Sequence, residues 1–254
     1  MKLNYKIIGS GRPAIILHGL FGMGDNWVSF AKKMSEDSFQ MILVDLRNHG
    51  HSPWSNDFSY SVMAADIAEL ILELQLENAV VIGHSMGGKV AMRLINDYPN
   101  VIAKAIIVDI APSSYPVKHR NILDAMLAVD LEKIKSRGEA EKILMNSIEE
   151  VSTRQFLLKN LYWIESEKLS WRFNLEVLNK NIDEIGEPVF PRTVVNIPIL
   201  FVKGENSGYI DSSRFAEIKE CYPEAKFITI KNAGHWVHAD QPQALLESVL
   251  LFLD

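Results

Sequence analysis

The sequence predicts an α/β protein with a mostly parallel central sheet that helices cover on both faces. Short, continuous apolar runs recur along the chain, and segments with apolar residues at helical spacing separate them. A strand that is buried on both faces reads as a continuous apolar run rather than an alternating one. The clearest strands are expected at residues 14–17, 41–44, 79–82, 105–108 and 199–202, with a further strand at 227–230.

Amphipathic helices are expected between these runs. Each has an apolar stripe that would pack against the sheet, while its polar residues face solvent. The stripes comprise Trp27, Phe30, Ala31 and Met34; Ile67, Leu70, Ile71 and Leu74; Val90, Leu94 and Tyr98; and Leu246, Val249, Leu250 and Leu253.

The region from residue 113 to residue 187 has a different pattern. Several amphipathic stripes follow one another there, without a convincing strand between them. We therefore expect residues 1–112 and 188–254 to form the core, and residues 113–187 to form an inserted, all-helical lid. The alternative is a pair of extra crossover helices. The stripes comprise Ile122, Met126 and Val129; Ile143, Leu144 and Ile148; Phe156, Leu157, Leu161 and Ile164; and Trp171, Leu175 and Leu178.

Composition narrows the class of protein. A chain of 254 residues can bury enough surface to fold without disulfides or structural metals, and its single cysteine, Cys221, fits a reducing compartment. The net charge of −6, with no cluster of Lys and Arg, argues against a nucleic-acid partner. Residues 1–9 do not resemble a signal peptide, and no apolar run approaches the ~18 residues of a membrane helix. We expect a soluble, cytoplasmic protein without a metal or an organic cofactor.

A G-x-S-x-G motif, Gly83-His84-Ser85-Met86-Gly87, follows the 79–82 run and opens a helical stripe. This strand–turn–helix context is typical of a nucleophile elbow, in which a strained turn projects the serine hydroxyl from the sheet edge. The flanking glycines relieve crowding because they have no Cβ. Ser85 is the predicted nucleophile, and the backbone N–H of Met86 is a predicted oxyanion donor. The alternative is a glycine-rich turn without chemistry.

Histidines near two strand ends complete the expected machinery. A serine hydroxyl needs a base to take its proton, and His235, in a loop after the 227–230 run, is the favoured base. His238 is its local competitor. After the 14–17 run comes His18-Gly19-Leu20, whose position predicts that the Leu20 N–H is the second oxyanion donor. We expect His18 itself to be structural.

Two carboxylates compete for the role of the acid that orients the histidine. The chain order of such sites is Ser, acid, His, and both candidates fit it. Asp109 ends the 105–108 run, whereas Glu205 follows the strand that ends at Val202. Asp109 is favoured because its side chain is shorter and stiffer, and Glu205 remains the alternative acid.

These motifs together resemble the α/β-hydrolase superfamily over almost the whole chain. His18-Gly19, the segment 45–52, the elbow at Ser85 and Gly234-His235 stand in the order found in that family. Many members carry D-x-R-G-x-G-x-S in the second of these motifs, and here Asn48 replaces the first glycine. We expect Asp45, His49 and His51 of this segment to be structural residues that shape the loop.

A sharper resemblance is to the YbfF-type esterases, carried by residues 108–112, 204–207 and 232–239. That subgroup takes its acid from the position of Asp109, and Ser207 stands where the wider family has an aspartate. The resemblance implies a serine carboxylesterase or thioesterase that forms an acyl-enzyme. Because fold and triad do not fix the reaction, carbon–carbon bond hydrolysis, perhydrolysis and non-hydrolytic ligand binding stay open.

The expected partner is a small-molecule ester or thioester. Trp163, Trp171 and Phe156 in the insertion favour an apolar acyl group. Lys118, His119 and Arg120, near its start, could meet an anionic leaving group such as coenzyme A, and the alternative is a solvated charged turn.

Overall fold

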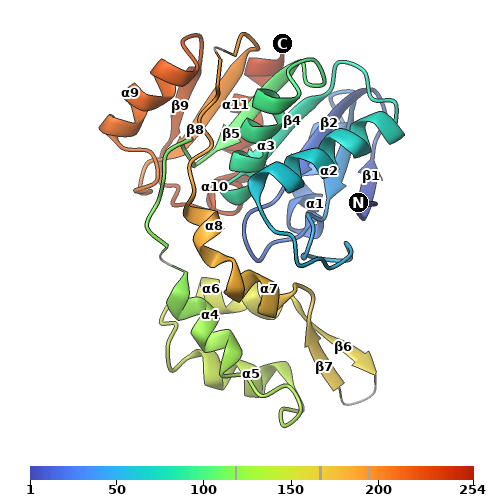
Figure 1. Ribbon diagram of the computed structural model, residues 1–254, viewed down its shortest axis with the longest axis vertical. Helices are drawn as coiled ribbons and strands as arrows, with labels where there is room; N and C mark the ends of the chain where they lie inside the picture. The colour runs from blue at the N-terminus through green and yellow to red at the C-terminus, as the bar shows by residue number, and fades with distance from the viewer. Residues whose placement is uncertain (118, 166–167, 194) are drawn as a thin grey trace.

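The computed structural model describes residues 1–117, 119–165, 168–193 and 195–254. Its central sheet has seven strands in the spatial order β1-β3-β2-β4-β5-β8-β9 (Figure 1). Neighbouring strands are parallel except for β1, which pairs antiparallel with β3. The strands are β1 (Tyr5–Ile8), β2 (Arg12–Leu17), β3 (Phe39–Val44), β4 (Val80–His84), β5 (Lys104–Val108), β8 (Ile199–Gly204) and β9 (Lys226–Ile230).

All of the strands that the sequence predicted are confirmed, whereas β1 was missed. The predicted strands β2, β4 and β5 lie inside the sheet with their apolar residues buried. β1 occupies an edge, and each of its residues is partly or fully exposed. An edge strand needs no continuous apolar run, so the pattern that revealed the other strands is absent from it.

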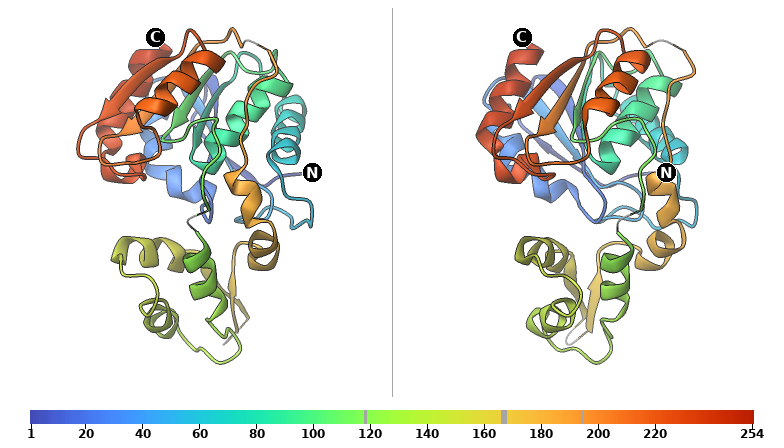
Figure 2. Two further views of the ribbon diagram at one scale, coloured as in Figure 1. Left: turned by 60° about the vertical axis from the view of Figure 1, so that its left-hand side comes forward. Right: turned by 90° about the vertical axis from the view of Figure 1, so that its left-hand side faces the viewer.

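Helices cover both faces of the sheet (Figure 2). On one face, α1 (Val28–Ser35) and α11 (Pro242–Leu253) pack against alternate strand residues such as Ala14 and Ile16. The other face, where Ile15 and Leu17 point, is covered by α2 (Tyr60–Glu73), α3 (Met86–Asp97) and α9 (Ser212–Cys221). Successive strand side chains point to opposite faces, which places one hydrophobic core on each side. The short η1 (Gly24–Trp27) and α10 (Val237–Asp240) complete this part of the chain.

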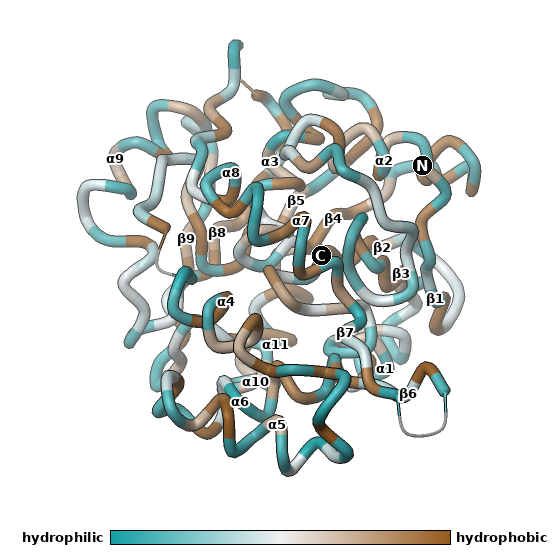
Figure 3. The backbone as a smooth tube through the Cα atoms, turned by 60° about the horizontal axis from the view of Figure 1, so that its bottom comes forward, coloured by the Kyte–Doolittle hydropathy of each residue, from teal (hydrophilic) through white to brown (hydrophobic). Residues whose placement is uncertain are grey.

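Between β5 and β8 the chain leaves the sheet and forms a separate layer, called the insertion below, which lies at one end of the sheet (Figures 1 and 2). Figure 3, viewed from that end, shows α4 to α7 in front of the sheet. The insertion comprises α4 (Arg120–Leu127), α5 (Arg137–Leu144), α6 (Val151–Leu158), β6 (Leu161–Glu165), β7 (Lys168–Trp171), α7 (Leu175–Lys180) and α8 (Ile182–Gly186).

The prediction that the insertion is all helical was wrong, because β6 and β7 pair antiparallel as a two-stranded sheet. Helix α6 ends at Leu158, so Leu161 and Ile164 do not continue its apolar stripe. Leu161 is buried at the start of β6, whereas Ile164 is 48% exposed. The intervening Tyr162 and Trp163 are aromatic residues that favour strands. Within the described ranges, no helix has the length and apolar character that crossing a membrane requires.

Candidate active site

Ser85 lies on the sharp turn between β4 and α3, with backbone angles φ 52° and ψ −117°. This left-handed conformation is unfavourable for a residue with a side chain, and such strain collects at functional sites. The turn needs the glycines on either side. A Cβ atom on Gly83 would lie 2.3 Å from the carbonyl oxygen of Gly87, and a Cβ atom on Gly87 would lie 2.3 Å from that of Leu17.

The structure brings Ser85, His235 and Asp109 into one hydrogen-bonded chain. The Oγ atom of Ser85 lies 3.0 Å from Nε2 of His235, and Nδ1 of His235 lies 2.8 Å from Oδ2 of Asp109. The three side chains come from loops after β4, β9 and β5, respectively. This order of hydroxyl, imidazole and carboxylate is the one that activates a serine for nucleophilic attack.

The carboxylate of Asp109 is completely buried and fixed by further donors. Its Oδ1 atom accepts a hydrogen bond of 3.0 Å from the N–H of Gly204. Its Oδ2 atom accepts a second bond, from the hydroxyl of Ser207, besides the one from His235. Ser207 thus belongs to the site. Its place in the sequence marked a departure from the wider family, but no local pattern indicated that it reaches Asp109.

His84, in the middle of the G-x-S-x-G motif, fixes the loop that carries His235. Its Nε2 atom donates a hydrogen bond of 2.8 Å to the carbonyl oxygen of His235. Burial lowers the pKa of His84 well below its usual value, which keeps the ring neutral. On another side, the ring of Tyr209 stacks on that of His235 with 4.0 Å between centroids. Sequence reasoning assigned no role to either residue.

Glu205, the alternative acid, and His238, the alternative base, make other contacts. Glu205 is exposed, and its carboxylate accepts a hydrogen bond of 2.9 Å from the N–H of Asn232. Among the described contacts, none joins it to His235. His238 stacks on Trp27 with 4.2 Å between ring centroids, so its imidazole is held against the side of the site. The geometry therefore favours Asp109 as the acid and His235 as the base.

The two backbone N–H groups predicted as oxyanion donors belong to Leu20, in the loop that passes Ser85, and to Met86, which follows Ser85. The carbonyl of Gly19 accepts hydrogen bonds from Nδ1 of His18 (2.8 Å) and from the N–H of Gly22 (2.9 Å). Because a trans peptide directs its C=O and N–H to opposite sides, the Leu20 N–H points away from these partners. Neither this N–H nor that of Met86 has a hydrogen-bond partner in the described part of the chain. A Cβ atom on Gly19 would lie 3.4 Å from Cβ of Ser85, which shows how closely this loop passes the elbow.

Two neutral histidines, His18 and His49, hold the loop that follows β2 in place through hydrogen bonds. Nε2 of His18 accepts a hydrogen bond of 3.0 Å from the N–H of Leu46, and burial lowers the pKa of His18. Nε2 of His49 accepts a bond of 3.3 Å from the N–H of Phe21, and burial lowers the pKa of His49 to about 3. Both rings therefore remain neutral acceptors, and the structural role expected for them fits these contacts.

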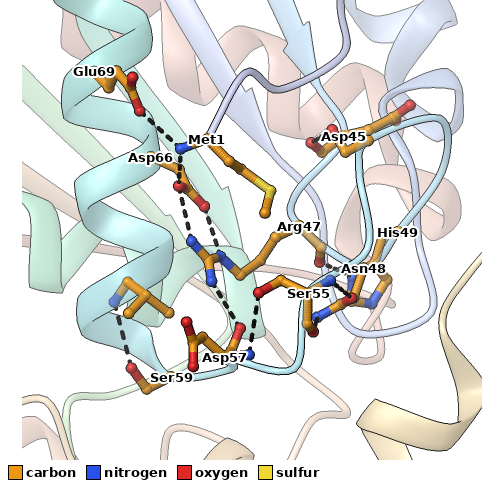
Figure 4. A network of polar contacts seen from close by, with 12 residues as sticks. Met1, Asp45, Arg47, Asn48, His49, Ser55, Asp57, Ser59, Asp66 and Glu69 are labelled. Carbon is orange, nitrogen blue, oxygen red and sulfur yellow. Dashed lines mark hydrogen bonds and ion pairs between the residues drawn. The ribbon is translucent and has the colours of Figure 1, made fainter.

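Residues 45–52, which follow β3, take part in a network of polar contacts (Figure 4). Asn48 has φ 64°, a conformation that asparagine tolerates better than most residues, which explains how it replaces the family's usual glycine. Arg47 donates two hydrogen bonds, of 2.7 and 2.9 Å, to the carboxylate of the buried Asp66 on α2. Asp45 accepts bonds from the N–H groups of Gly24 and His51, each 2.8 Å long. The contacts of Asp45 fit the structural role expected for it.

A cavity of about 100 Å³ opens beside Ser85, between the sheet edge and the insertion. Phe156 lines it, whereas Trp171 is buried against Phe173 and Trp163 is 47% exposed. Of the aromatic residues expected to favour an apolar substrate, only Phe156 is therefore among the lining residues.

Arg120, a charged residue described near the start of the insertion, is not among the residues that line the cavity. His119 lines the cavity, but burial lowers its pKa to about 4, so its ring is neutral at physiological pH. Arg120 is exposed and donates a hydrogen bond of 2.6 Å to Asn179. Lys118 lies outside the described residues. In the ranges that are described, no group of three or more His, Cys, Asp or Glu side chains is arranged to hold a metal ion.

The fold and this site define an α/β hydrolase, and comparison with known proteins agrees. A family described as α/β hydrolase fold matches residues 13–134. The chain is 40% identical over 263 residues to the mouse protein named sn-1-specific diacylglycerol lipase ABHD11, a match covering 100% of this chain and 85% of the mouse protein. The chain belongs to the α/β-hydrolase family.

Other relatives carry the name esterase. The chain is 36% identical over 244 residues to esterase YbfF of Escherichia coli, covering 95% of this chain and 93% of that protein. A solved structure described as a marine microorganism esterase superimposes with a TM-score of 0.96 at 42% identity, covering 99% of both chains. The resemblance to YbfF-type esterases is confirmed.

Proposed function

We propose that this protein is a serine esterase, a hydrolase of carboxylic esters with Ser85 as nucleophile, His235 as base and Asp109 as acid. The observation that carries the proposal is the hydrogen-bonded chain from Ser85 through His235 to the buried Asp109. The esterase and lipase names of the relatives support it. Small-molecule esters are the proposed substrates.

The mechanism is two-step acyl transfer. His235 takes the proton of Ser85 as its Oγ atom attacks the ester carbonyl, and Asp109 stabilises the resulting imidazolium. The unpartnered N–H groups of Leu20 and Met86 bind the oxyanion, and one such donor is worth about 100- to 1,000-fold in kcat. His235 then protonates the leaving group, and water attacks the acyl-enzyme by the same route. The residues alone supply this chemistry, so the proposal includes no cofactor.

We assign residues 1–112 and 188–254 to the catalytic core, and residues 113–187 to a lid over the site. Several residues of the insertion line the cavity beside Ser85, among them His119, Ile122 and Phe156, which supports this role. A cytoplasmic location remains a prediction from the single half-buried cysteine, Cys221.

The first test is hydrolysis of p-nitrophenyl esters by the wild type and by Ser85→Ala. Removal of a serine nucleophile costs about 10⁶-fold in kcat in a comparable triad, so we expect activity at the background level in the variant. Mass spectrometry of the wild type during turnover should show an acyl adduct on the Ser85 peptide. Comparable turnover in Ser85→Ala, with both proteins folded by circular dichroism, would disprove the proposal.

The reaction class needs a second measurement, because a triad also supports carbon–carbon bond hydrolysis and perhydrolysis. Values of kcat/KM for matched ester, thioester and diketone substrates distinguish ester hydrolysis from carbon–carbon bond hydrolysis. Esters are expected to give the highest value. A higher value for the diketone, or peracid formation exceeding hydrolysis, would favour the alternative reactions.

A further inference from the structure

Two cavities meet at Ser85, and they differ in size and in lining. The larger has a volume of about 100 Å³, and the smaller about 20 Å³. Ser85 and His119 line both of them. His235 and Leu20 line the larger cavity, whereas Met86 lines the smaller. Each cavity therefore borders a different part of the proposed catalytic machinery.

The chemistry of the reaction assigns one half of the ester to each cavity. The leaving oxygen must lie within hydrogen-bond reach of Nε2 of His235, which gives it a proton. That requirement places the alcohol half in the larger cavity, beside His235. The carbonyl oxygen lies between the N–H groups of Leu20 and Met86. The remaining substituent of the carbonyl carbon, the acyl chain, is then directed into the smaller cavity.

We propose, on the basis of the proposed esterase function, that this enzyme is selective for short acyl groups, acetyl and propionyl, on bulky apolar alcohols. About 10–15 Å³ on the same measure of volume admits one water-sized group. At about 20 Å³, the smaller cavity accommodates a methyl or an ethyl group. The larger cavity, with about five times this volume, accommodates the alcohol.

The walls of the smaller cavity are held in place by hydrogen bonds. The hydroxyl of Tyr60 donates to the carbonyl of Ile185 (2.9 Å), and that of Tyr115 donates to the carbonyl of Tyr209 (2.6 Å). All four residues line this cavity. A longer acyl chain that pushed these walls apart would have to break these bonds, and a buried polar group that loses its partner is costly.

A buried lysine fixes the same wall from behind. Lys89 on α3 is 1% exposed, and its Nζ atom donates to the carbonyls of Glu187 (2.5 Å) and Gly186 (3.4 Å) at the end of α8. Gly186 lines the small cavity, and α3 begins directly after Ser85. A side chain of the helix that follows the nucleophile is thus hydrogen-bonded to this wall.

The larger cavity is predominantly apolar, which defines the kind of alcohol. Its aromatic and aliphatic lining residues include Phe21, Trp27, Ile122, Phe156, Leu157 and Trp236. The rings of Phe156 and Trp236 contact each other across the boundary between the insertion and the core, with 5.5 Å between centroids. An aromatic or branched aliphatic alcohol would bury more apolar surface here than a linear, polar one.

The experiment uses two substrate series and a matched pair of variants. One series varies the acyl chain of p-nitrophenyl esters from acetyl to octanoyl, and the other varies the alcohol of acetate esters from ethanol to naphthol. Ile185 lines the smaller cavity and Ile122 the larger; both belong to the insertion and are half-buried. Ile185→Ala and Ile122→Ala therefore remove the same atoms from the walls of the two different cavities.

For the wild type, we expect kcat/KM to fall steeply beyond propionyl, since one misfitting methylene is worth about 10- to 200-fold. Ile185→Ala should shift the acyl optimum to longer chains, whereas Ile122→Ala should change the alcohol preference and keep the acyl optimum. Ile185→Val, a smaller change, repeats the test if the alanine variant does not fold.

Wild-type preference for hexanoyl or octanoyl esters would overturn the assignment, as would a reversal of the two variants' effects. An absence of Ser85-dependent hydrolysis with every ester would instead disprove the esterase function itself. The two failures are therefore distinguishable.

Discussion

The side-chain amide of Asn160 donates a hydrogen bond of 2.8 Å to the backbone carbonyl of Phe21, and this bond joins the insertion to the loop after β2. Asn160 is completely buried between α6 and β6. Phe21 has φ 60°, and its N–H bonds to His49. The strained residue next to Leu20, the proposed oxyanion donor, is thus held on both sides.

We predict that Asn160→Ala lowers kcat by about 10- to 100-fold with a smaller change in KM, because a displaced oxyanion donor acts on the transition state. Asn121→Ala, at an exposed position on α4, is the matched control and should leave both constants unchanged. Steady-state kinetics, with a urea titration of each variant, measure the effect. A loss of stability at an unchanged kcat would mean that Asn160 holds the insertion in place without positioning the donor.

We predict that the variants Asp109→Asn and Glu205→Gln differ widely in kcat. The carboxylate of Asp109 contacts His235, whereas that of Glu205 bonds to Asn232. An Asp-to-Asn change in a serine protease triad lowers kcat about 10⁴-fold, and we expect a comparable loss for Asp109→Asn. Glu205→Gln should retain most of the activity. The opposite ranking in kcat measurements would transfer the role of the acid to Glu205.

We predict that Ser207→Ala lowers kcat by roughly 10- to 100-fold, because a hydrogen bond to a charged group contributes about 1.5–3 kcal/mol. The hydroxyl of Ser207 donates to the same Asp109 oxygen that contacts His235. Ser207→Thr keeps a hydroxyl and should restore most of kcat. If Thr and Ala variants are equally impaired at equal thermal stability, the hydrogen bond is not the reason for the loss.

Stability should fall as the pH drops below about 6.5. Burial lowers the pKa of five histidines in the folded protein, whereas the unfolded chain keeps ordinary values, so the unfolded state binds protons first. Each such proton destabilises the fold by up to about 1.4 kcal/mol per pH unit, between the unfolded and folded pKa values. These histidines are His18, His49, His84, His119 and His238.

Urea unfolding at pH 8, 7, 6 and 5 measures this dependence. His238→Phe removes one of the groups, whose pKa burial lowers to about 4, and keeps a ring to stack on Trp27. We expect this variant to lose less stability between pH 7 and pH 5 than the wild type does. If the free energy of unfolding falls equally with pH in the two proteins, His238 does not contribute to the pH dependence of stability.

Local patterns in the sequence determined the buried strands of the sheet and the elbow. A strand buried on both faces requires a continuous apolar run, so strands such as β2 and β4 could be predicted from a few neighbouring residues. The turn at Ser85 has steric demands that only glycine meets at Gly83 and Gly87, and these demands also act within a few residues. Pattern and structure therefore agree for the buried strands and for the elbow, where the constraint acts within a few residues.

The tertiary structure decided which distant groups meet. The contact between Asp109 and His235 spans 126 positions, and that between Asp109 and Ser207 spans 98. The choice between Asp109 and Glu205 depended on which strand end faces the histidine, and no local pattern encodes that. The bond from Asn160 to Phe21 and the sizes of the two cavities were hidden for the same reason. The β6–β7 pair joins neighbouring residues, such as Leu161 and Trp171, and was missed because Leu161 and Ile164 also fit a helical stripe. Hydrogen bonding and packing between distant segments depend on how the elements are placed in space, and only the folded chain fixes that placement.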